Sequence, residues 1–213
     1  MFRFFLFLLV FSFLGYGSYY LCLRESYKVQ ASELIEQGKI EQALRVLLAW
    51  KQLEPQADSV YLLLGKVYLQ KYLKSGLQVD LNLAEGFFLR SDELFSRDPK
   101  LHYAWAQLSK IRAGIEITEK GYTDYIFHMR RACQLDPKNY YYYSIYFETL
   151  ISFLTDLSYL RVPLDHKLYL DEVSYALQGY LSLKKYYRDQ YLSLVKAHFD
   201  EQEQAAILGG ENE

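Results

Sequence analysis

The chain opens with an uninterrupted apolar stretch, Phe4 to Leu23, which contains 20 residues and no charge. Arg3 precedes this stretch and Arg24 follows it. A helix that crosses a bilayer needs about 20 mainly apolar residues, because it rises roughly 1.5 Å per residue. Tyrosines gather toward the far end of the stretch, where aromatic rings favour the membrane interface. The pattern predicts a single transmembrane helix at residues 4–23, within a first segment of residues 1–24.

The same residues also fit a cleaved signal peptide. In that interpretation residues 4–14 form the apolar core, and the small residues Gly15 and Gly17 precede a cleavage site before Ser18. The apolar residues continue beyond that site through 21–23, which favours a retained anchor. One alternative predicts a protein held in a membrane, and the other predicts a secreted or periplasmic protein.

The orientation of such an anchor depends on the charges at its two ends. Arg3 and the terminal amine stand on one side, and Arg24 and Lys28 stand on the other. The positive-inside rule is therefore nearly balanced. An uncleaved signal-like segment usually leaves its basic start in the cytoplasm. We accordingly expect a single-pass membrane protein whose folded part lies outside the cytoplasm.

From Tyr27 onward the hydrophobic pattern has a helical period, and no run alternates as a strand does. An acidic residue followed by proline recurs three times, at Glu54-Pro55, Asp98-Pro99 and Asp136-Pro137. Each pair follows one amphipathic segment and precedes another. Because proline cannot continue a helix, each pair ends one helix and prepares the next. The pattern predicts an all-α solenoid of helical hairpins over residues 25–203, followed by a flexible tail at 204–213.

Some boundaries can be predicted more closely. Asp165 is a suitable cap for a helix over residues 166–183, and a last helix is expected over residues 187–203. Linkers are expected at residues 74–76 and 119–121, where a glycine follows charged or small polar residues.

A recurring set of small and bulky residues accompanies these hairpins. In one predicted hairpin the first helix carries Tyr61, Leu64-Gly65 and Tyr68. The hairpin before it has Ala43 and Leu47 on its second helix and ends at Pro55. The hairpin after it has Trp105 and Leu108 on its first helix and Ala132 on its second, and ends at Pro137. The set resembles the tetratricopeptide repeat (TPR) family over residues 27–151. The resemblance implies a TPR-like helical-hairpin solenoid in which small residues let neighbouring helices approach closely.

The resemblance also implies a place for a protein partner. In TPR proteins the first helix of each hairpin lines a concave face that grips an extended peptide or a helix. The corresponding positions include Lys28, Lys66, Tyr103, Lys110, Tyr141 and Glu148. The three lysines could form a basic ladder beside two tyrosines, suited to an acidic or aromatic segment. Alternatively, these lysines are ordinary solvated positions.

A run of tyrosines at residues 140–143, followed by Tyr146, forms a second candidate patch. One helix cannot direct all of these rings to the same side. Some rings must therefore be exposed, or covered by a partner or by the helices that follow Pro163.

Composition excludes several classes of function. The formal net charge of −2, without a clustered basic face, gives no basis for binding nucleic acid. The four histidines fall on separate predicted helices, and no metal, phosphate-loop or nucleophile motif is present. We therefore expect no enzyme activity, no cofactor and no metal. The 22 tyrosines fit a helix-packing role and a binding groove equally well.

These observations predict a non-catalytic, membrane-anchored scaffold for protein interaction, or an assembly subunit of a membrane or envelope complex. The alternative is a secreted or periplasmic solenoid that binds a peptide, glycan or small ligand in a tyrosine-rich groove.

Overall fold

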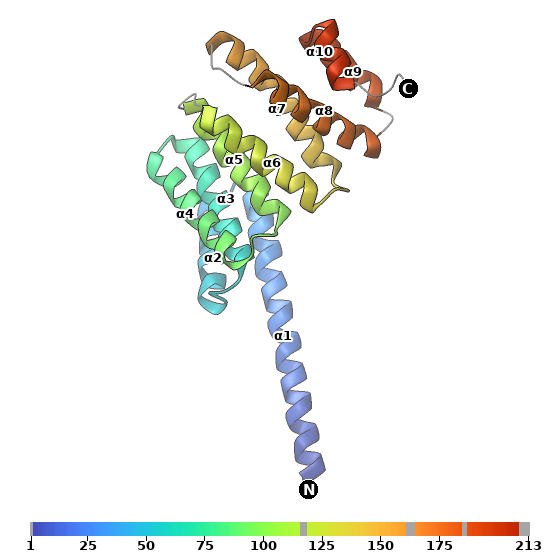
Figure 1. Cartoon of the computed structure of the whole chain (residues 1–213). Coiled ribbons are helices and arrows are strands. Elements are labelled where there is room, and N and C mark those ends of the chain that lie inside the picture. The colour runs from blue at the N-terminus through green and yellow to red at the C-terminus, as the bar shows by residue number, and fades with distance from the viewer. Residues whose placement is uncertain (1, 116–118, 161–164, 185–186, 209–213) are drawn as a thin grey trace. The chain divides into compact units, whose positions relative to one another are not determined.

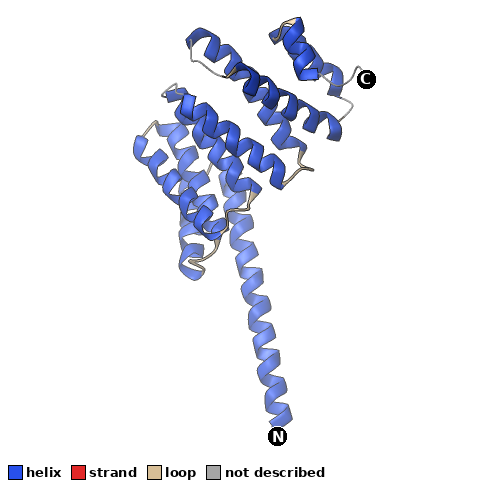
Figure 2. Ribbon diagram, viewed as in Figure 1, coloured by secondary structure: helices blue, strands red, loops and turns tan. Residues whose placement is uncertain are grey.

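The computed structural model describes residues 2–115, 119–160, 165–184 and 187–208, and gives no side chains for 2–14, 16, 115, 119, 154–160 and 166. Within these ranges the chain forms helices joined by short turns, and no strand occurs (Figure 2). The helices divide between two compact units, which meet in sequence between Ser96 and Arg97. The predicted all-α architecture is confirmed.

The first unit contains two helical hairpins. Its helices are α1 (Phe2–Glu36), α2 (Ile40–Leu53), α3 (Asp58–Ser75) and α4 (Gln78–Leu94). Helix α1 packs on α2 and α3 packs on α4, with α2 also lying against α3 (Figure 1). Gly38 and Gly76 make the turns within the hairpins, with φ of 68° and 69°. Glycine adopts this left-handed conformation without steric cost, which is why it ends a helix so often.

The hairpins of the first unit approach closely because small residues stand at their contacts. Ala31 and Ala43 are fully buried between α1 and α2, beside Leu47 and Trp50. At Gly65 on α3, an added Cβ would lie 2.3 Å from the Phe88 ring of α4. No side chain fits at that separation. The small-residue positions that the repeat pattern identified therefore serve helix packing.

The second unit contains the remaining helices. These are α5 (Pro99–Ile115), α6 (Glu119–Leu135), α7 (Tyr140–Leu160), α8 (His166–Leu183), α9 (Arg188–His198) and α10 (Glu201–Leu208). Helix α5 packs on α6, α7 packs on α8, and α10 lies against α8 and α9. Pro99 is the first residue of α5 and Pro137 lies in the turn before α7, as the acidic-proline pattern predicted.

The predicted capping of α8 is confirmed: the Asp165 side chain accepts a hydrogen bond from the Leu168 backbone N–H, at 3.2 Å. Two predicted linkers are wrong in extent. Residues 119–121 form the first turn of α6, and Lys74 and Ser75 belong to α3. Both helices are longer than the repeat pattern required.

The carboxyl-terminal region differs from the prediction of one last helix and a tail. The chain breaks at Phe199 and Asp200, which separates α9 from α10. Helix α10 then continues to Leu208 and buries Ile207 completely, so the predicted tail at 204–213 is helical in its first half. Residues 209–213 lie outside the described ranges. The helix continues because Ile207 has an apolar surface on which to pack.

The tyrosine run is divided between core and surface. Tyr142, Tyr143 and Tyr146 are buried, whereas Tyr140 and Tyr141 are 44% and 48% exposed. The Tyr143 ring lies so close to Gly179 of α8 that an added Cβ there would be 2.2 Å away. The later helices therefore cover part of the run, which was one of the two interpretations of this patch.

Helix α1 is continuous from Phe2 to Glu36, so one helical backbone passes through the predicted membrane segment and enters the first hairpin (Figure 1). In the described part of the chain, no helix combines the length and the apolarity that crossing a membrane requires. The predicted segment, residues 4–23, lies mostly in the part of α1 whose side chains are not described.

Candidate protein-interaction surface

Four of the six predicted partner-binding residues lie on two helices of the second unit. Tyr103 and Lys110 belong to α5, and Tyr141 and Glu148 belong to α7. Each pair is seven residues apart, which is about two helical turns, so its members share one face of their helix. Both helices are the first of a hairpin, as the repeat pattern requires of positions that bind a partner.

The two tyrosines are in contact. The hydroxyls of Tyr103 and Tyr141 lie 3.4 Å apart, and their ring centroids are 5.9 Å apart in an edge-to-face arrangement. The Tyr142 ring lies beside Tyr103, at 5.5 Å between centroids. Burial, followed by the hydrogen bond to Tyr141, raises the pKa of Tyr103. Its hydroxyl therefore stays protonated at neutral pH and can donate or accept a hydrogen bond.

Two charged residues stand about two turns along the same helices. The Lys110 ammonium donates to the Thr149 hydroxyl at 3.3 Å. Glu148, the neighbour of Thr149, accepts hydrogen bonds from the hydroxyls of Tyr191, at 3.1 Å, and Ser144, at 3.2 Å. Lys110 and Glu148 are both exposed. The surface thus presents two aromatic rings with hydroxyls, one ammonium and one carboxylate, all held by neighbouring side chains.

The other two predicted residues lie in the first unit. Lys28 on α1 forms an ion pair with Glu25, at 3.7 Å, and Lys66 is half-buried on α3. The basic ladder of Lys28, Lys66 and Lys110 needs lysines from both units, and it stays a prediction.

A histidine pair in the second unit was missed by sequence reasoning. The Nδ1 atoms of His102 on α5 and His128 on α6 lie 3.2 Å apart, and the Trp105 ring stacks on His128. Burial, together with the charge of His102, lowers the pKa of His128 to about 4. The four histidines do lie on separate helices, as predicted, but the contact between these two was not predicted. Only the register between α5 and α6 brings them together, and the sequence carries no signal of that register.

A buried carboxylate links three helices of the same unit. Glu172 of α8 is 1% exposed and accepts hydrogen bonds from Arg130 of α6 and Tyr146 of α7. Burial and the carboxylate raise the pKa of Tyr146. This network holds helices together rather than facing a cleft. Within the described part of the chain, no cluster of three or more His, Cys, Asp or Glu residues is placed to hold a metal ion.

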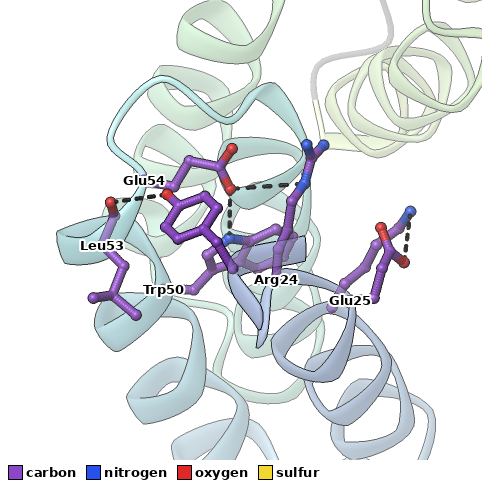
Figure 3. Close-up of polar contacts among 7 residues, drawn as sticks. Arg24, Glu25, Trp50, Leu53 and Glu54 are labelled. Carbon is purple, nitrogen blue, oxygen red and sulfur yellow. Dashed lines mark hydrogen bonds and ion pairs between the residues drawn. The ribbon is translucent and has the colours of Figure 1, made fainter. Parts of the chain in front are cut away.

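In the first unit, the end of α2 is fixed to α1 by polar contacts (Figure 3). The Tyr20 hydroxyl donates to the Leu53 carbonyl at 3.3 Å, and the Arg24 guanidinium lies 3.7 Å from the Glu54 carboxylate. The buried Trp50 indole N–H donates to the same carboxylate at 3.1 Å. These contacts attach α1 to the hairpin close to where the predicted membrane segment ends.

No protein-family model matches this chain, and no curated protein sequence matches it. Among solved structures it is similar to PilF of Pseudomonas aeruginosa, a TPR-containing protein, with a TM-score of 0.51. The two are 14% identical, and the match covers 87% of this chain and 84% of the other. At that identity the likeness concerns the fold alone. The chain has an all-α, TPR-like fold built of helical hairpins.

Proposed function

We propose that this protein is a non-catalytic, membrane-anchored scaffold that binds a protein partner as a subunit of a membrane or envelope complex. TPR-like folds typically act as protein-interaction scaffolds, which supports the general class. The observation that carries the proposal is the exposed surface of α5 and α7, where Tyr103 meets Tyr141 beside Lys110 and Glu148. We refer to it as the tyrosine surface.

The chemistry of the tyrosine surface suits a peptide segment. Tyrosine provides a large contact area with few rotatable bonds and a hydroxyl that can form hydrogen bonds, which is why it often dominates binding energy at interfaces. Lys110 can pair with a carboxylate of the partner, and Glu148 with an ammonium or guanidinium group. A segment that carries an apolar or aromatic side chain next to charges of both signs would satisfy this surface.

The membrane part of the proposal rests on residues 4–23 as a retained anchor, with the solenoid outside the cytoplasm. One observation supports retention: the apolar residues continue past the possible cleavage site before Ser18.

Purification of the full-length protein from its native membranes in mild detergent, followed by mass spectrometry, tests the proposal. We expect an intact amino terminus and stoichiometric protein partners. The double variant Tyr103→Ala/Tyr141→Ala should lose most of the partner. Tyr187→Ala is the matched control, because Tyr187 is a 51% exposed tyrosine of the same unit outside this surface.

The contrary outcomes are equally specific. A chain that begins near Ser18 and stays in solution would reject the anchor and favour a secreted or periplasmic solenoid that binds a smaller ligand. Partner recovery that is equal in the double variant and the control would reject the tyrosine surface as the binding site.

A further inference from the structure

The carboxyl-terminal turn of α2 lies beside the last turn of the predicted membrane segment. Tyr20 is inside that segment, and its hydroxyl bonds to the carbonyl of Leu53, the last residue of α2. Arg24, one turn further along α1, pairs with Glu54. Two contacts one turn apart fix both the depth and the rotation of α2 relative to α1 (Figure 3).

These contacts fix how far the first hairpin stands from the membrane. Residues 4–23 rise about 30 Å as a helix, which equals the thickness of a bilayer's hydrocarbon core. Tyr20 precedes the end of that segment by three residues and so lies about 4.5 Å inside the boundary. A group that bonds to the Tyr20 hydroxyl cannot stand clear of the headgroup layer, which adds only about 5–8 Å on each side.

We propose that the last turn of α2 is a second membrane contact, seated in the headgroup layer beside the anchor. The inference rests on the anchor proposed above and adds a lipid-facing surface of the solenoid itself. The contact would hold the first unit at one height above the bilayer, because the unit would then be attached by both α1 and α2.

The chemistry of this surface fits the membrane interface. Leu53, Tyr19 and Leu21 are 49%, 66% and 58% exposed, and Tyr19 and Leu21 flank Tyr20 in the chain, so these large apolar side chains can face lipid on either side of the Tyr20–Leu53 contact. The nearby charges are two ion pairs, Arg24 with Glu54 and Lys28 with Glu25, and the Lys51 ammonium in the last turn of α2, which lies 5.5 Å from the centroid of the Tyr61 ring. The surface therefore has little net charge. We expect the contact to form on phosphatidylcholine alone, without anionic lipid.

Fluorescence quenching in vesicles tests this contact. The full-length chain with Leu53→Cys and Cys22→Ser would carry an environment-sensitive fluorophore at position 53, in phosphatidylcholine vesicles that contain a lipid with a headgroup nitroxide. Cys133 is buried and would not be labelled in the folded protein. The matched control is Leu73→Cys in the same background. Leu73 is 64% exposed near the opposite end of α3, about 22 Å from the α2 end.

The expected result is at least threefold stronger quenching at position 53 than at position 73. Equal and weak quenching at both positions would overturn the α2 contact. The same result is expected if this surface binds a protein rather than lipid. Equal and strong quenching at both positions would overturn it as well, because the whole unit would then be lying on the membrane.

A label on the native Cys22 separates this result from failure of the anchor. Cys22 is exposed and lies in the last turn of the predicted segment. Quenching at position 22 without quenching at 53 keeps the anchor and rejects the α2 contact. Absence of quenching at position 22 rejects the anchor, and the α2 contact with it.

Discussion

The two units use the same helical hairpins but fill their cores differently. The core of the first unit is mainly aliphatic, with Trp50 as its largest buried side chain. The core of the second unit is built on tyrosines, and among the side chains that the structure describes eight are buried: Tyr122, Tyr125, Tyr142, Tyr143, Tyr146, Tyr169, Tyr180 and Tyr191. Buried hydroxyls need partners, and this unit supplies them from Glu172 and from backbone carbonyls such as that of Leu150.

The difference shows how one architecture can be stabilised in two ways. An aliphatic core tolerates small rearrangements, because its contacts have no preferred direction. A tyrosine core requires that each ring be packed and that each hydroxyl be hydrogen-bonded at the same time. It therefore restricts the relative positions of the helices more strongly. We therefore expect single polar changes to damage the second unit much more than the first.

The largest expected effect is at Glu172. The change Glu172→Ala would leave the buried Tyr146 hydroxyl without its acceptor and would remove the ion pair of Arg130, whose side chain is 46% exposed; together these losses should cost about 2–4 kcal/mol of unfolding free energy. Hydrogen exchange measured by mass spectrometry should show that amides of the second unit lose protection, whereas amides of the first unit keep theirs.

The matched control is Glu93→Ala in the first unit. Glu93 pairs with Arg90, but its side chain is 63% exposed. An exposed pair contributes less than about 1 kcal/mol, so exchange should hardly change. Equal effects of the two substitutions would remove the contrast between the units.

The next effect compares two glycines that serve the same purpose in the two units. A Cβ at Gly65 would lie 2.3 Å from the Phe88 ring, and a Cβ at Gly179 would lie 2.2 Å from the Tyr143 ring. Overpacking of this kind costs about 1–3 kcal/mol. Gly65→Ala and Gly179→Ala should therefore lower the unfolding free energy by similar amounts, as measured by denaturant titration.

A control for both glycines is Gly86→Ala on α4, where an added Cβ meets no atom within 4 Å. That substitution should be neutral or slightly stabilising, because alanine favours a helix. A much larger loss at Gly179 than at Gly65 would mean that the tyrosine core is also the less adaptable one sterically.

The contrast also explains which features could be predicted from the sequence. Proline and capping residues act locally, so Pro55, Pro99 and Asp165 predicted helix ends that the structure confirms. Small-residue positions were equally readable, because the repeat pattern specifies Gly65 by its neighbours along the chain. Such signals need no knowledge of the partner helix.

Features that depend on register between helices could not be predicted. The pairing of His102 with His128, and the choice of which tyrosines are covered, follow from how α5 and α7 lie against later helices. The break at Phe199 and Asp200 was missed for a similar reason, since α10 is held by packing on α8. For Tyr103 and Tyr141, the sequence predicted only that both residues lie on the concave face of the solenoid, and not that they are in contact.

The histidine pair gives an intermediate effect that depends on pH. His128 titrates near 6.5 when unfolded and at about 4 when folded, so the unfolded chain binds the extra proton between these values. The unfolding free energy should therefore fall as pH decreases from about 6.5 to about 4 and then level off. We expect a loss on the order of 2 kcal/mol, after allowing for the partial exposure of His128.

Denaturant titrations at several pH values would measure this loss, with His128→Gln as the comparison. Glutamine does not titrate here, so the part of the slope between pH 6.5 and 4 that arises from His128 should disappear. An unchanged slope would assign the acid sensitivity to other groups of the second unit.

The smallest expected effect on stability is at the tyrosine surface, and it distinguishes the two uses of tyrosine within one unit. Tyr103→Phe removes the hydroxyl that lies against that of Tyr141. Tyr141 is 48% exposed, so its hydroxyl can bond to water instead. The unfolding free energy should change by less than about 0.5 kcal/mol. Tyr146→Phe removes a hydroxyl that donates a hydrogen bond to the buried Glu172, and it should cost about 1–2 kcal/mol.

If the tyrosine surface binds a partner through its hydroxyls, the order of the two effects reverses in a pull-down assay. Tyr103→Phe then weakens binding severalfold, and Tyr146→Phe leaves binding unchanged in the folded protein. If Tyr103→Phe lowered both the unfolding free energy and partner binding, Tyr103 would instead be a structural residue of the core. The tyrosine surface would then have no separate role in binding.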